Sequence, residues 1–122
     1  MTMDLQEMFG EPISVYTRAQ AIEDGVLADV TGWSREVGFT CSTVMTAKLW
    51  GAVEQCPAGQ DVRGRAHDVL WMAALALRRQ LKNGGADCLF DVLLRVGRSQ
   101  KQTLRVVADG DGVTIGFADD EW

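Results

Sequence analysis

The sequence predicts an α+β fold, with helices packed on an antiparallel sheet. Up to residue 82, apolar residues recur mainly every three or four positions, which is the period of a helix. From Cys88 onward the period changes to two, in three segments separated by short connections. The length of 122 residues and the 47% hydrophobic content suit one core. We therefore expect a single domain over residues 1–122, with the helices segregated ahead of the sheet.

The N-terminal part predicts two short strands with a short helix between them. Residues 13–16 and 26–30 are rich in β-forming side chains. Thr17 and Gln20 fit a capping box, in which the two side chains satisfy each other's backbone N–H groups. Gly25 should end this helix, because glycine accepts the left-handed conformation found after helices.

The middle of the chain predicts two further helices. Thr31 or Ser34 can cap the first, which Gly38 closes. Ser42 is the expected cap of the second, whose apolar residues lie on one side between residues 45 and 56.

The longest helix is expected near residues 61–82, ending at the Asn83-Gly84-Gly85 sequence. Its apolar stripe predicts the central core helix, lying across one face of the sheet. The stripe consists of Ala66, Val69, Leu70, Ala73, Leu77 and Leu81, and it is broadened by Trp71, Met72 and Ala74.

The C-terminal third predicts a three-stranded antiparallel meander. Alternating apolar residues occur over residues 88–96, 104–108 and 113–117. The connection Asp109-Gly110-Asp111-Gly112 has the Asp-Gly signal of a tight hairpin, which we prefer over a calcium loop because the rest of such a loop is missing.

Charge is unevenly distributed along the chain. Residues 1–62 carry a net charge of −6, residues 63–105 a net charge of +6 and residues 106–122 a net charge of −5. Apolar residues interleave with the charges throughout, so we interpret the three blocks as faces of a folded surface.

Several classes of protein are disfavoured by what the sequence contains. The longest uncharged apolar stretch, residues 69–77, is about half of the ~20 residues that a membrane helix needs, and the first residues do not resemble a signal peptide. The cysteines are odd in number and form no CxxC pair, which favours reduced thiols. We expect a cytoplasmic protein without membrane association, metal or cofactor.

Catalysis near neutral pH would depend on His67, the single histidine of the chain. Its neighbour Asp68 points elsewhere on a helix, and a Cys-His pair would need Cys41 or Cys56 to be brought beside it by the fold. We interpret His67 as a helix-surface residue and expect no enzymatic activity.

Acidic residues are the candidate partner-binding surface. Trp50 and Trp71 should be structural, whereas Trp33 and Trp122 could be exposed, and an exposed aromatic residue among acids is typical of a protein-binding hot spot. The candidate residues are Asp109, Asp111, Asp119, Asp120, Glu121 and Trp122 near the C-terminus, together with Glu23, Asp24 and Asp29.

The segment from Phe9 to Val30, FGEPISVYTRAQAIEDGVLADV, resembles the signature of a family of short proteins of unassigned function from bacterial plasmids, integrative elements and phages. A second match is Asp68-Val69-Leu70-Trp71-Met72, leading to Arg78-Arg79. The resemblance implies an accessory protein of a mobile element, and small acidic proteins of that kind often look like anti-CRISPR or anti-restriction inhibitors.

Three functions are therefore compared. The first is an anti-defence inhibitor that binds a host defence protein or ribonucleoprotein, such as a CRISPR effector, through an acidic surface. The second is a nucleic-acid accessory protein that uses the basic 63–105 region, although an isoelectric point near 4.7 makes direct nucleic-acid binding the weaker hypothesis. The third is a small modifying enzyme, for instance one with an ADP-ribosyltransferase-like fold. A homodimer is compatible with each.

Overall fold

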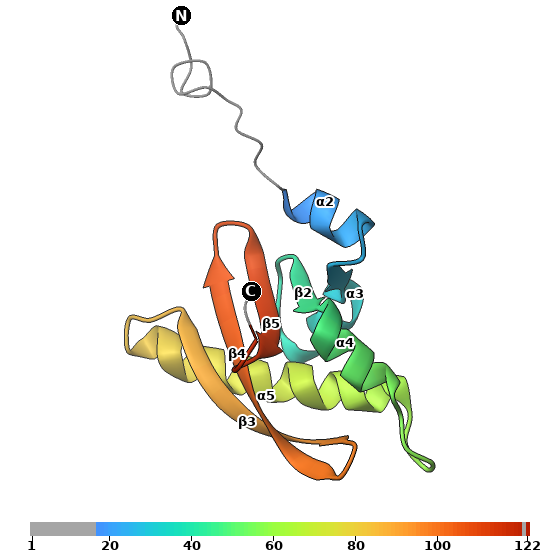
Figure 1. Cartoon of the computed structure of the whole chain (residues 1–122). Coiled ribbons are helices and arrows are strands. Elements are labelled where there is room, and N and C mark those ends of the chain that lie inside the picture. The colour runs from blue at the N-terminus through green and yellow to red at the C-terminus, as the bar shows by residue number, and fades with distance from the viewer. Residues whose placement is uncertain (1–16, 121) are drawn as a thin grey trace, which may run out of the picture.

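The computed structural model describes residues 17–120 and 122, and it has the predicted α+β fold. A mixed five-stranded sheet has the strand order β1-β2-β5-β4-β3. The long helix α5 lies behind this sheet in Figure 1, and the short helix α2 lies at its upper end. The predicted strand at residues 13–16 is outside the described residues. The strands are β1 (Leu27–Asp29), β2 (Thr43–Thr46), β3 (Asp87–Val96), β4 (Ser99–Asp109) and β5 (Gly112–Phe117).

Helix α2 (Arg18–Glu23) begins with the predicted capping box. The backbone N–H of Gln20 donates to the Thr17 hydroxyl at 3.1 Å, and the Thr17 N–H donates to Gln20 Oε1 at 2.9 Å. Gly25 follows the helix with a φ of 79°, which is the left-handed conformation expected of it. The local signals of this segment therefore determine its structure.

Helix α3 (Thr31–Ser34) continues into the 3-10 helix η1 (Arg35–Val37), and Gly38 closes η1 with a φ of 100°. Thr31 is the first residue of α3 and not its cap, and Ser34 is the N-cap residue of η1 without a capping hydrogen bond from its side chain. Asp29 takes the capping role instead, since its Oδ1 accepts hydrogen bonds from the N–H and the hydroxyl of Thr31.

The helix that Ser42 was expected to cap begins later. Residues Thr43–Thr46 form β2, and α4 spans Ala47–Glu54 with the Thr46 hydroxyl as its cap, which accepts from the Leu49 N–H. All four residues of β2 are buried, because this strand lies between β1 and β5. Pairing on both sides therefore overrides the helical spacing that continues from Met45 to Leu49.

Helix α5 spans Val62–Lys82, with Asp61 as its cap, and confirms the predicted central helix. Its predicted stripe faces the core, except that Leu81, Trp71 and Met72 are exposed. Burial of this stripe against the sheet removes apolar surface from water and so stabilises the fold. The buried members from α5 are Ala66, Val69, Leu70, Ala73, Ala74 and Leu77.

The meander of β3, β4 and β5 is also confirmed, with antiparallel pairs throughout. Asp109 pairs with Gly112, so residues 110–111 form the tight hairpin that the sequence predicts. The remaining pairs are antiparallel β1-β2 and parallel β2-β5, and this parallel pair makes the sheet mixed.

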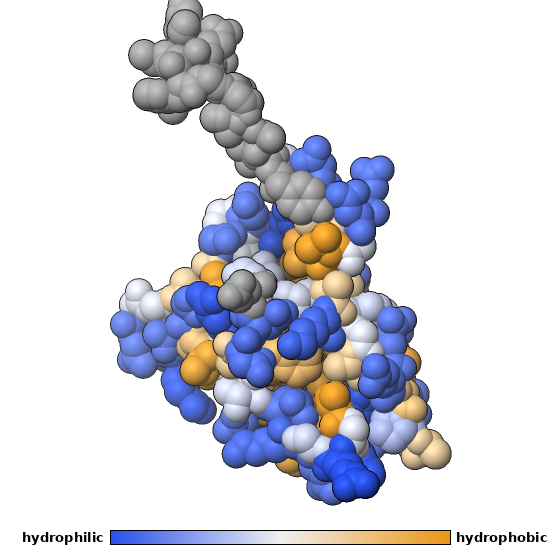
Figure 2. Space-filling view, viewed as in Figure 1, coloured by the Kyte–Doolittle hydropathy of each residue, from blue (hydrophilic) through white to orange (hydrophobic). Residues whose placement is uncertain are grey.

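The face of the sheet opposite α5 is called the outer face here, and it is only partly covered. Helix α2 is held on it by Arg18, whose Nη1 donates to the Thr114 hydroxyl at 2.9 Å. The Trp122 ring lies against Gly116 of β5, and its Nε1 donates to the Phe117 carbonyl at 2.9 Å. Figure 2 shows this side as mainly hydrophilic, with hydrophobic side chains in separate small areas.

Candidate functional site

Carboxylates from three segments gather at the end of the molecule that holds α2 and the β4-β5 hairpin. These two elements lie together at the top of Figure 1, far from the β3-β4 hairpin. All five carboxylate side chains are exposed. We call this set the acidic end, and it comprises Glu23, Asp24, Asp29, Asp109 and Asp111.

The β4-β5 hairpin presents Asp109 and Asp111 in a fixed turn. Asp109 Oδ1 accepts from the Asp111 N–H at 2.8 Å. The next residue, Gly112, has a φ of 131° and lies against the Ser42 carbonyl, where a side chain would clash. The Val113 N–H donates to the same carbonyl at 2.8 Å, so the hairpin is attached to the start of β2.

Asp29 stands at the end of β1, opposite Val44 of β2. Its Oδ1 accepts from the Thr31 hydroxyl at 2.6 Å and from the Thr31 N–H at 3.0 Å. These hydrogen bonds lower the pKa of Asp29, and the bond from the Thr31 hydroxyl has the largest effect. The nearby positive charge of Arg18 lowers it further by a smaller amount. The carboxylate is therefore firmly ionised at neutral pH.

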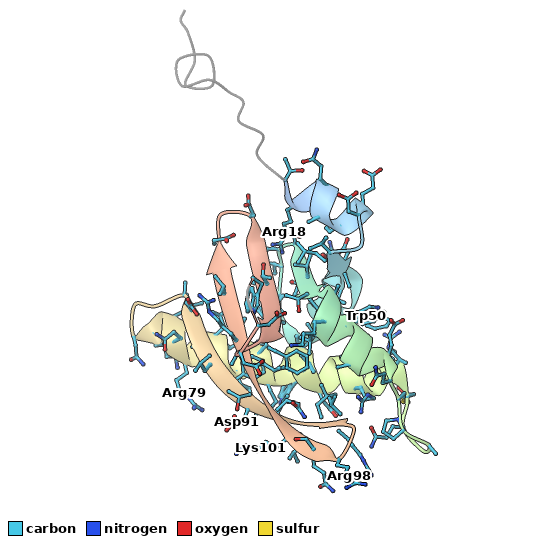
Figure 3. All side chains as sticks on the ribbon, viewed as in Figure 1. Arg18, Trp50, Arg79, Asp91, Arg98 and Lys101 are labelled. Atoms are coloured by element: carbon cyan, nitrogen blue, oxygen red, sulfur yellow. The ribbon has the colours of Figure 1, made fainter. Side chains whose placement is uncertain are left out.

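Arg18 is the cation that lies among these acids, and its guanidinium is used inside the fold. Nε donates to the Ser42 hydroxyl at 3.0 Å, and Nη2 donates to the carbonyls of Ser42 and Val113 at 3.1 and 2.6 Å. With the Thr114 bond, Arg18 ties α2 to β2 and β5. Figure 3 shows Arg18 pointing from α2 toward the sheet. Its half-buried charge leaves the acidic end with more exposed negative than positive charge.

An aromatic cleft of about 300 Å³ adjoins Asp29. Trp33 and Trp50 line it, with ring centroids 5.7 Å apart and planes inclined at 50°. Both rings are half-buried, so the expectation that Trp33 is exposed is only partly met. A carboxylate beside indole rings can accommodate the stem and the charge of a lysine or arginine side chain.

The other predicted acids lie at the opposite end of β5. Asp119 and Asp120 follow this strand, and Glu121 is outside the described residues. Trp122 is half-buried, because its ring covers Gly116 and the Arg105 guanidinium lies 5.1 Å from its centroid. The fold thus separates Asp119 and Asp120 from the acidic end.

The nine basic residues of the 63–105 region do not form one surface. Figure 3 places Arg79 on the later part of α5, whereas Arg98 and Lys101 lie toward the β3-β4 hairpin. Arg105 is paired with Asp87 at 2.5 Å and Lys101 with Asp91 at 3.3 Å. Arg63 forms an ion pair with Glu36.

Arg65 is the basic residue whose position differs most from the sequence interpretation. It is 4% exposed, and its guanidinium donates to the carbonyls of Ala52, Val53 and Arg95 at 2.8–2.9 Å. The sequence held a signal for this, because Arg65 precedes Val69 by four residues and so shares the apolar face of α5.

His67 is half-buried on α5, and its ring stacks on that of Trp71 with centroids 6.3 Å apart. Cys41, Cys56 and Cys88 are free thiols, and burial, with a smaller effect of Asp87, raises the pKa of Cys88. Within residues 17–120 and 122, no group of three or more His, Cys, Asp or Glu side chains could hold a metal ion. None of the helices in that part of the chain is long and apolar enough to cross a membrane.

An exposed apolar strip was missed by sequence reasoning. Trp71, expected to be structural, is 45% exposed, and Leu93 of β3 is 78% exposed. Both line a groove of about 490 Å³ between α5 and β3. The alternation in residues 88–96 placed Leu93 on the outer face, but only the strand order leaves that part of the face uncovered.

No family model, no curated protein and no solved structure matches this chain.

Proposed function

We propose that this protein is a non-enzymatic inhibitor, encoded by a mobile element, that binds a host defence complex in the bacterial cytoplasm. The acidic end is the docking surface. The partner is a nucleic-acid-binding complex of the CRISPR effector type, and the contact is made at its basic channel. The resemblance of residues 9–30 to short proteins of plasmids and phages supports the mobile-element origin.

The observation that carries this proposal is the gathering of five exposed carboxylates at one end, around a cation that is used internally. Clustered carboxylates on rigid elements produce a local negative potential that attracts a basic surface. Arg18 supplies one positive charge among the five carboxylates, so the potential of the acidic end remains negative. A basic nucleic-acid channel is the complementary surface.

The aromatic cleft adds a place for anchoring. Once the acidic end is near a basic channel, a lysine or arginine of the partner can lie against Trp33 or Trp50 with its charge near Asp29. The attraction between the acidic end and the basic channel sets the association rate, and the desolvated contact in the cleft slows dissociation.

The alternative of a nucleic-acid accessory protein is less well supported. Phosphate binding needs basic residues on one face without adjacent carboxylates. Three exposed or half-exposed basic residues pair with carboxylates here, and Arg65 is buried. A modifying enzyme has no comparable support, because His67 stacks on Trp71 of the same helix.

Co-purification tests the proposal. The tagged protein is expressed in bacteria that carry a CRISPR effector, the lysate is treated with nuclease, and the captured effector is quantified. The test variant combines Asp109→Asn with Asp111→Asn, since asparagine retains the side-chain acceptor of the turn. The matched control combines Asp119→Asn with Asp120→Asn, which removes the same charge at the other end of β5.

We expect the wild type and the control to retain the effector after nuclease treatment, and the hairpin variant to retain several-fold less. Equal capture by all three proteins would contradict the assignment of the acidic end. Loss of capture upon nuclease treatment would favour the nucleic-acid accessory function.

A further inference from the structure

Strand β3 is a long sheet edge with unpaired backbone groups. It has ten residues, whereas β1 at the other edge has three. Within residues 17–120 and 122, β4 is the strand that pairs with β3, and no strand pairs with its other side. An edge of this length is a template for a further strand.

The direction of the free groups follows from the register. The Ala108 N–H donates to the Ala86 carbonyl at 2.8 Å, so even-numbered residues of β3 direct their peptide groups toward β4. The odd-numbered residues therefore direct theirs to the free edge. Arg65 binds the Arg95 carbonyl at 2.9 Å, which marks the end of this edge, so it extends from Asp87 to Leu93.

The same odd-numbered residues place an alternating set of side chains on the outer face. In order, they are Asp87, Leu89, Asp91, Leu93 and Arg95. Leu89 is 62% exposed and Leu93 is 78% exposed. The pairing of β3 with β4 is regular up to Leu93 and has an irregularity between Leu93 and Val96. Strand β3 contains no lysine or proline, which are two of the features that protect edges from pairing.

This sequence is complementary to itself. Antiparallel pairing with a second copy about a two-fold axis at Asp91 places Leu89 opposite Leu93 and Asp87 opposite Arg95, each pair occurring twice. Leu89, Asp91 and Leu93 then exchange their free backbone hydrogen bonds, whereas Asp87 and Arg95 of the two copies face each other through their side chains. Asp91 faces its own copy. Within each chain its charge is paired with that of Lys101 at 3.3 Å, and the Thr103 hydroxyl donates to it at 2.7 Å.

Helix α5 extends the apolar part of this edge. Trp71 and Met72 line the groove beside residues 91–93, and with Leu75 they are exposed large hydrophobic residues of α5. A second copy that continues the sheet brings its own α5 alongside and covers these side chains. Exposed apolar groups next to an open strand edge are characteristic of an interface.

We infer that this protein forms a two-fold symmetric dimer through antiparallel pairing of β3 with β3 of a second copy, which joins the two sheets. The inference is independent of the acidic end, which lies on other elements. Complementary Leu and Asp/Arg pairs identify a second copy, and not an unrelated strand, as the occupant.

Sedimentation measures the dimer directly. The molecular mass of the wild type, measured by sedimentation equilibrium over a concentration series, should be twice the mass of one chain. Leu93→Lys should halve this mass while its circular dichroism melting curve stays that of the wild type, because the side chain is exposed. Leu81→Lys, at an exposed leucine near the end of α5, is the control and should remain dimeric.

Cross-linking tests the register. In a background with Cys41, Cys56 and Cys88 replaced by serine, Leu89→Cys and Leu93→Cys are prepared separately and then mixed. Paired residues in this register have Cα atoms about 5.5 Å apart, which suits a disulfide. The mixture should form a covalent dimer upon oxidation, and each variant alone should not.

A wild type that is monomeric throughout the concentration series overturns the inference. A dimer that persists in Leu93→Lys also overturns it, because the interface then lies elsewhere. A Leu93→Cys variant that cross-links by itself overturns it as well, because the two-fold axis is then not at Asp91. None of these results depends on capture of a defence complex.

Discussion

The hydrogen bonds of individual side chains determine which charged groups are exposed on the surface of this protein. Among the described residues, the hydrogen bonds of Arg18 and Arg65 go to carbonyl and hydroxyl oxygens and not to carboxylates. Asp29 is stabilised in its ionised form by hydrogen bonds from Thr31. A count of charged residues in the sequence therefore overestimates the exposed positive charge, and it overestimates the exposed negative charge less.

The hydroxyl of Thr31 controls the titration of Asp29. Thr31→Val should raise the pKa of Asp29 toward its ordinary value, because the hydroxyl hydrogen bond is the largest cause of the lowering. Carboxyl NMR titration measures this change, with Thr40→Val as the control at an exposed threonine. An unchanged Asp29 pKa in Thr31→Val would contradict the assignment.

The same bond predicts how stability changes with pH. A carboxyl group whose pKa is lowered by folding stabilises the native state above its unfolded pKa, near pH ~4, and loses this contribution as pH falls through the lower folded pKa. Asp87 and Asp91 have lowered pKa values too, through Arg105 and Thr103 respectively. Acid unfolding of Thr31→Val should therefore show a smaller pH-dependent loss than the wild type.

At the level of elements, local signals in the sequence determine α2, α5 and the meander. The Thr17-Gln20 capping box, Asp61 before α5 and the alternation in residues 88–117 each depend on neighbours along the chain. Strand β2 could not be predicted in this way. Thr43–Thr46 is short, its apolar spacing continues into α4, and its parallel pairing with β5 joins segments about 70 residues apart.

Arg65 connects three elements, and its removal tests this connection. Its guanidinium binds the carbonyls of Ala52 and Val53 in the last turn of α4 and that of Arg95 in β3. Arg65→Met should lower the free energy of unfolding by about 2–4 kcal/mol, because buried carbonyls lose charged donors. Urea unfolding provides the measurement.

The control for this substitution is Arg79→Met, on the exposed side of the same helix. Its expected loss is below about 1 kcal/mol, since only an exposed charge near the helix end is removed. A loss at Arg65 no larger than that at Arg79 would show that the buried hydrogen bonds contribute little.

For the molecule as a whole, the fold converts three charge blocks along the chain into a different arrangement in space. Residues 106–122 are split, because β5 separates Asp109 and Asp111 from Asp119 and Asp120. The β4-β5 hairpin, which carries Asp109 and Asp111, instead lies at the same end of the molecule as α2. The sequence identified all of these residues as candidates, but the strand order decides which of them lie together.

The central claim is that the acidic end occupies the nucleic-acid channel of a defence complex, so that protein and DNA exclude one another. The direct measurement is the binding of labelled target DNA to the purified effector at increasing concentrations of this protein. We predict that the wild type displaces the DNA, more weakly as salt concentration rises, and that Asp109→Asn with Asp111→Asn displaces it several-fold less effectively than Asp119→Asn with Asp120→Asn. Simultaneous binding of DNA and this protein to the effector would contradict the account.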